Sequence, residues 1–122
     1  MKRRIELQPD MTNVLALEQP QQYRCRVVGY LLERSLMVVE VTLANEQFYV
    51  VFPDVHYYDG TFLWQGASLR IASREEQFDY MLEKSIVAAL GMLFVFDGID
   101  STVNVLGGEW IAIFDELPDR FK

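Results

Sequence analysis

The sequence predicts an α+β domain: a mostly antiparallel, strongly curved sheet of about seven or eight strands, with one amphipathic helix at about residues 74–90 packed on it. Three observations support this prediction. Short apolar stretches with two-residue alternation recur along the chain and are joined by short turns, as in antiparallel sheets. One segment has helical periodicity and a capping signal. This helix stands between runs of strands, which argues against a parallel βαβ fold.

The whole chain, residues 1–122, is expected to form one domain. Its 122 residues suffice to bury a full core, and 51% of them are hydrophobic. Residues 1–22 are predicted to be a lead-in arm with one short strand or turn, because they are mostly polar and contain Pro9 and Pro20. Residues 115–122 are predicted to be a polar tail.

Strands are predicted wherever β-branched and aromatic residues alternate between turns. In the first half of the chain these segments are 23–31, 36–43 and 47–52. Short joins between them favour antiparallel neighbours. Two further strands flank the predicted helix, at 67–71 and 92–96.

Two hairpins are predicted from glycine-containing turns. Asp59-Gly60 stands between two aromatic runs, and Asp-Gly is a preferred pair for a two-residue hairpin turn. Gly107-Gly108 joins two short apolar runs in the same way. The strands of these hairpins are expected at 55–58, 61–64, 102–106 and 109–114.

The helix has clear signals at both ends. Ser73 and Glu76 match a capping box, and Gly91 is placed to end the helix after Leu90. At 100° per residue, the stripe predicted to face the sheet contains Phe78, Met81, Leu82, Ser85, Ile86 and Ala89. The acidic residues Glu76, Asp79 and Glu83 lie off this stripe, with no lysine placed to pair with all three.

Charge and composition exclude several classes of function. The net charge is −7, and fourteen of the eighteen acidic residues follow residue 34, so a nucleic-acid partner is not expected. The chain has no apolar run of the ~18 residues that a membrane span needs, and no membrane partner is expected. The basic start at 2–4 lacks the apolar segment of a signal peptide. The single cysteine, Cys25, agrees with a reducing compartment, so we expect a cytoplasmic protein.

Motifs for catalysis and metal binding are absent from the sequence. It contains no phosphate loop, catalytic-serine elbow or zinc-spaced cysteines, and His56 is the only histidine. We therefore expect no cofactor and no metal. An enzymatic role, with His56 near carboxylates as a general base, is open but less favoured. Cys25 is predicted to be buried and structural, because strand alternation sends Arg24 and Arg26 to the opposite face.

The preferred interpretation is a small, acidic, non-enzymatic protein-interaction module that forms a homo-oligomer, expected to be a dimer. Its partner would be a basic protein, as for an immunity or inhibitor protein or a chaperone of a secreted protein. The residues expected to bind this partner are acidic ones on the helix and aromatic ones on the first hairpin: Glu76, Asp79, Glu83, Tyr57, Tyr58 and Trp64.

Two alternatives are kept open. The first is a small-molecule-binding or enzymatic domain with a pocket between the curved sheet and the helix. This pocket would be lined by Tyr30, Tyr49, His56, Tyr58 and Trp64. The second is a structural or assembly subunit, which would require a large apolar interface between copies of the chain.

Overall fold

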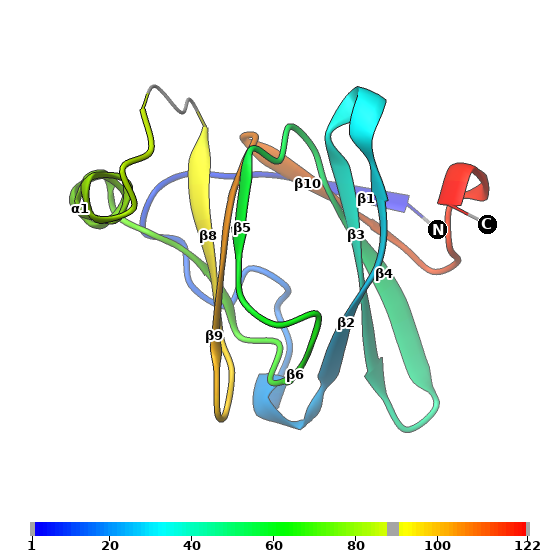
Figure 1. The fold of residues 1–122 in the computed structure, drawn as a ribbon. Coiled ribbons are helices and arrows are strands. Elements are labelled where there is room, and N and C mark those ends of the chain that lie inside the picture. Colours follow the sequence, from blue (N-terminus) through cyan, green and yellow to red (C-terminus); the bar gives the residue numbers. More distant parts are fainter. Residues whose placement is uncertain (1, 88–90, 122) are drawn as a thin grey trace.

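The chain forms a two-layer β-sandwich with a helix on the outer face of one layer (Figure 1). The computed structural model describes residues 2–87 and 91–121. The strands are β1 (Lys2–Glu6), β2 (Arg24–Leu31), β3 (Leu36–Leu43), β4 (Glu46–Phe52), β5 (Tyr57–Asp59), β6 (Leu63–Gln65), β7 (Leu69–Ile71), β8 (Met92–Asp97), β9 (Thr102–Gly107) and β10 (Trp110–Phe114). The helical elements are α1 (Arg74–Glu83) and the short 3-10 turns η1 (Pro20–Gln22), η2 (Leu32–Arg34) and η3 (Asp119–Phe121).

The strands divide between two antiparallel sheets, which confirms the α+β class. Sheet A has the order β1-β10-β4-β3-β2-β6, and sheet B has the order β5-β9-β8-β7. The expected single, strongly curved sheet of seven or eight strands is not confirmed, because ten strands in two sheets occupy the described part of the chain. One short helix covers only one sheet face, and the second sheet supplies the cover for the other face.

Aromatic side chains fill the core between the two sheets. Phe52 of β4 meets Phe94 and Phe96 of β8 edge to face, with ring centroids 5.2 and 6.1 Å apart. Trp64 of β6 packs on Phe96 at 5.0 Å and donates its indole N–H to the Gly66 carbonyl at 3.0 Å. Large buried aromatic rings are a major source of packing energy, so these contacts join the sheets into one core.

The two predicted hairpins are wrong, because both glycine turns are corners where the chain changes sheets. β5 pairs with β9 in sheet B, whereas β6, which follows Asp59-Gly60, pairs with β2 in sheet A. β9 likewise pairs within sheet B, whereas β10 pairs with β4 in sheet A. Turn residues specify a reversal of the chain, but they do not specify which strand accepts the ladder hydrogen bonds.

Helix α1 begins where predicted and ends earlier. The Glu76 amide donates to the Ser73 hydroxyl at 3.0 Å, which confirms the cap. The helix ends at Glu83 rather than near residue 90, because Ser85 adopts a left-handed conformation with φ 57°. The Ile86 amide then donates to the Met81 carbonyl at 2.8 Å, which closes a Schellman motif without glycine. The predicted helical residues 88–90 lie outside the described residues.

The helix is also rotated relative to the predicted apolar stripe. Gln77 is its buried residue: the side-chain oxygen accepts from the Leu93 amide at 3.1 Å, and the side-chain nitrogen donates to the Gly91 carbonyl at 3.2 Å. Met81 packs against sheet B, whereas Phe78 and Leu82 are 61% and 64% exposed. The contact between α1 and β8 is therefore partly polar, which the hydrophobic pattern does not reveal.

The lead-in arm contacts both sheets, because the Val14 amide donates to the Leu69 carbonyl of β7 at 2.8 Å, whereas the C-terminal segment packs on sheet A. In the lead-in arm, β1 pairs with β10, and Leu7, Val14 and Leu15 are buried. At the other end, η3 lies beside the outer face of sheet A (Figure 1), and Phe121 packs there against Val38, Val51 and Ala112. Within the described residues, no helix has the length and hydropathy needed to cross a membrane.

Candidate functional site

The three acidic residues predicted to bind a partner lie around one hollow beside α1. This hollow has a volume of about 450 Å³ and is lined by Ser73, Glu75, Glu76, Asp79, Tyr80 and Glu83. Glu76, Asp79 and Glu83 therefore share a surface, as the helical spacing indicates.

Glu76 differs from the other acids because its charge is compensated. Arg70 of β7 donates two hydrogen bonds to the Glu76 carboxylate, at 2.8 and 3.0 Å. These bonds hold the pKa of Glu76 below its usual value. In the described part of the chain, no ion pair involves Glu75, Asp79 or Glu83. The uncompensated negative charge of this surface therefore comes from these three carboxylates.

An exposed apolar pair lies next to these carboxylates. Phe78 and Leu82 are separated by one helical turn and have most of their side-chain surface in water. At 100° per residue, they share one outward face of the helix with the three uncompensated acids. We call this set the helix face: Glu75, Phe78, Asp79, Leu82 and Glu83. The sequence pattern assigned the two apolar residues to the buried side, so it missed them as site residues.

Tyr57 of β5 packs against α1 through Tyr80. Its ring meets the ring of Tyr80 edge to face, with centroids 6.2 Å apart. The Tyr80 hydroxyl donates to the Asp59 carboxylate at 2.9 Å, and Lys84 approaches the same carboxylate at 3.5 Å. These contacts fix the helix to the edge of sheet B at β5.

The other two aromatic residues of the predicted partner surface lie elsewhere. Trp64 is 4% exposed and belongs to the core between the sheets. Tyr58 lines a pocket at the edge of the sandwich, which we call the edge pocket. Its volume is about 420 Å³, and its lining residues are Val27, Tyr30, Met37, Val55, His56, Tyr57, Tyr58 and Phe62.

The edge pocket brings together three of the five residues predicted to bind a small molecule, namely Tyr30, His56 and Tyr58. The ring of Tyr58 stacks on Phe62, with centroids 5.6 Å apart and planes 5° apart. Its hydroxyl donates to the Thr61 carbonyl, and burial raises the pKa of Tyr58 to about 12. The Tyr30 hydroxyl donates to the Val55 carbonyl at 3.4 Å. Both phenols are thus engaged with the backbone, and the pocket offers aromatic faces more than free polar groups.

Tyr49 and Trp64 do not line the edge pocket. Tyr49 is partly buried and packs on the outer face of sheet A with Val38, Val51 and Ala112. The same outer face carries a third hollow, lined by residues of β3, β4 and β10 and by the C-terminal segment. No sequence pattern indicates this hollow, because its walls come from four separate segments.

Comparisons of the chain with known protein families, with curated proteins and with solved structures find no match. Among the described residues, no group of three or more His, Cys, Asp or Glu side chains is arranged to hold a metal ion.

Proposed function

We propose that this protein is a non-enzymatic interaction module that binds a basic, amphipathic segment of another protein on the helix face. The observation that supports this most directly is the exposure of Phe78 and Leu82 beside three uncompensated carboxylates. Adjacent exposed apolar side chains on a rigid element, bordered by charge, are characteristic of protein-binding surfaces.

The chemistry of the helix face defines the partner. Burial of a Phe or Leu side chain contributes about 1.5–3 kcal/mol, so Phe78 and Leu82 supply the apolar contact. Glu75, Asp79 and Glu83 would then meet Lys or Arg side chains around it. Opposite charges at the rim accelerate association and select among partners. An apolar ridge flanked by basic residues is therefore the expected complement.

The helix face is held rigidly before any partner arrives. Arg70 fixes the first turn of α1 through Glu76, and Gln77 fixes its middle to the backbone of β8. At the other end, Tyr80 and Lys84 contact Asp59. A surface fixed in this way loses little conformational entropy on binding.

The experiment is capture by the tagged protein from lysate of the native cells, followed by titration of the purified partner. The variants are Asp79→Lys/Glu83→Lys and Phe78→Ser/Leu82→Ser. A charge-matched control, Glu33→Lys/Asp100→Lys, changes two exposed acids away from α1. We expect both helix variants to lose a basic partner that the control retains. Equal retention by all variants, or equal loss in the control, would contradict the proposal.

A homo-oligomer through the same face makes a different prediction. The parent protein would then show concentration-dependent sedimentation, which Phe78→Ser/Leu82→Ser would abolish. That result would show that a second copy of the chain, and not a basic partner, occupies the helix face, because the face would be buried in the oligomer.

The edge pocket supports a second candidate function, binding of an aromatic small molecule. The supporting observation is the clustering of Tyr30, His56 and Tyr58 around about 420 Å³, a volume typical of ligand sites. A thermal-shift screen of planar aromatic metabolites tests it, with Phe62→Ala removing the stacked wall and Phe78→Ala as a control of the same type. Stabilisation lost only in Phe62→Ala would support this function, and equal stabilisation of both variants would refute it.

A further inference from the structure

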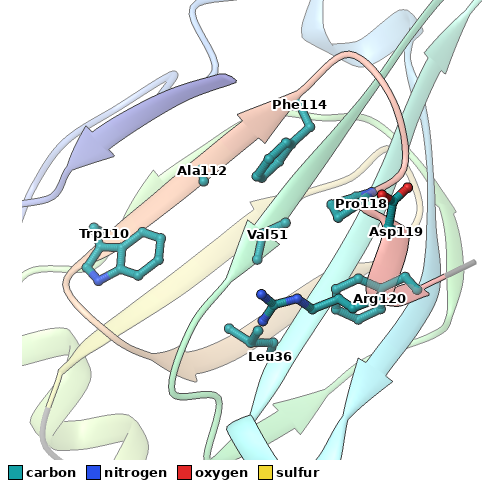
Figure 2. Close-up of a pocket in the computed structure, with 9 residues that line it drawn as sticks. Leu36, Val51, Trp110, Ala112, Phe114, Pro118, Asp119 and Arg120 are labelled. Carbon is teal, nitrogen blue, oxygen red and sulfur yellow. The ribbon is translucent and has the colours of Figure 1, made fainter. Parts of the chain in front are cut away.

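We infer that the hollow on the outer face of sheet A binds a small carboxylic acid with an aromatic or branched apolar body. We call this hollow the outer trough. It has a volume of about 470 Å³, and its lining residues are Leu36, Val51, Trp110, Ala112, Phe114, Pro118, Asp119, Arg120 and Phe121. Figure 2 shows most of these side chains around a common floor.

The depth of the outer trough comes from one small residue between two large ones. Alternation along β10 turns Trp110, Ala112 and Phe114 to the same outer face. Ala112 pairs with Val51 of the neighbouring strand, so two short side chains form the floor between aromatic walls. The C-terminal segment closes the trough on its far side through Pro118 and Phe121. An apolar body of moderate size fits such a space.

The polar end of the trough is a guanidinium. Figure 2 shows the Arg120 side chain extending over Leu36, toward the floor at Val51. Within the described residues, Arg120 makes no ion pair. The Asp119 carboxylate also lines the trough, on its Pro118 side (Figure 2), so an anionic group belongs at the Arg120 end. A guanidinium binds a carboxylate through two parallel hydrogen bonds, which makes a carboxylic acid the best complement.

The net charge is −7, but the uncompensated carboxylates of the helix face are remote from the trough. The acidic helix face lies beyond sheet B, on the opposite side of the molecule (Figure 1). Near the trough, the Arg4 guanidinium lies 4.3 Å from the ring centroid of Trp110. Arg4 is paired with Glu6 at 2.7 Å, which leaves Arg120 as the cation placed to bind the ligand.

The test compares naphthoic acid with naphthamide, which has the same apolar body without the charge. Binding of each compound is measured by calorimetry, and the site is mapped by NMR chemical shifts. The parent protein should bind the acid at least about tenfold more tightly than the amide, because charge-assisted hydrogen bonds exceed neutral ones. The largest shifts should fall on Trp110, Ala112 and Phe121.

Two variants separate the charge from the apolar floor. Arg120→Gln should remove the preference for the acid and leave amide binding nearly unchanged. The control Arg74→Gln, at an exposed arginine on α1, should change neither the binding of the acid nor that of the amide. Ala112→Met should weaken the binding of both compounds, because the larger side chain fills the floor of the trough. Thermal unfolding checks that this variant is folded. Four results would each overturn the inference. These are equal binding of the acid and the amide by the parent, no binding of the acid, an unchanged preference for the acid in Arg120→Gln, and chemical-shift changes confined to the edge pocket.

Discussion

Arg70 and Glu76 form a two-point ion pair that joins strand β7 to the first turn of α1. The Nη1 and Nη2 atoms of Arg70 donate to Oε1 and Oε2 of Glu76 at 2.8 and 3.0 Å. The Nε atom of the same residue donates to the Asp97 carboxylate at 2.8 Å. One guanidinium therefore links β7, α1 and the end of β8, and it does so on the side of the helix next to the proposed binding surface.

We predict that Glu76→Gln lowers stability in a pH-dependent way. The pair is partly exposed, with 32% and 42% of the side chains in water, so the loss at neutral pH should be about 1 kcal/mol or less. Arg70 holds the pKa of Glu76 below its usual 4.5, so this stabilisation exists above that pH. It is lost as the pH falls through the lowered pKa of the folded state.

Urea unfolding of the parent and of Glu76→Gln at about pH 7 and about pH 3 measures this effect, with Glu75→Gln as the matched control. The difference between parent and Glu76→Gln should shrink at the lower pH. A difference of the same size at both pH values would show that the pair does not titrate as described.

Gln77 is predicted to be the most sensitive position of α1. Its buried amide accepts from the Leu93 N–H and donates to the Gly91 carbonyl, so Gln77→Met leaves both backbone groups without these partners. An unsatisfied buried polar group costs about 1–3 kcal/mol. Thermal unfolding checks this, and Gln22→Met, at an exposed glutamine of η1, should have little effect. Equal melting temperatures for the parent and Gln77→Met would show that water replaces both contacts.

The elements that the sequence predicts well are those determined by residues close to one another in the sequence. The strands at 36–43 and 47–52 are confirmed as β3 and β4, and Ser73 caps α1 as expected. The division into two sheets depends instead on distant pairings, such as β1 with β10. No local pattern encodes such a pairing, which explains why both glycine turns were predicted as hairpins.

The candidate site was predictable to the same extent. Helical spacing places Asp79 and Glu83 on one surface, and the structure agrees. The ion pair of Glu76 was not foreseen, because Arg70 lies on a strand and the spacing rules for ion pairs apply within a helix. The exposure of Phe78 was also missed, since a polar residue, Gln77, occupies the buried side.

Cys25 is predicted to be unreactive in the folded protein. The thiol is 0% exposed, and burial raises its pKa to about 12, so neither access nor a thiolate is available at neutral pH. A chromogenic disulfide reagent should label it only after addition of denaturant. An exposed cysteine introduced as Ala44→Cys in a Cys25→Ala background should react at once and serves as the positive control. Rapid labelling of native Cys25 would show that the edge between β2 and β6 opens readily.

Ser85→Gly is predicted to stabilise the protein. Ser85 follows the C-cap residue of α1 with φ 57°, a conformation that costs an L-residue about 1 kcal/mol and costs glycine little. Glycine also increases the freedom of the unfolded chain, so the expected net gain is about 0.5 kcal/mol. Ser85→Ala keeps the strain and should give no gain. Urea unfolding of the two variants and the parent measures the difference in the free energy of unfolding. If the glycine variant is no more stable than the alanine variant, α1 does not end in a Schellman motif at Ser85 in solution.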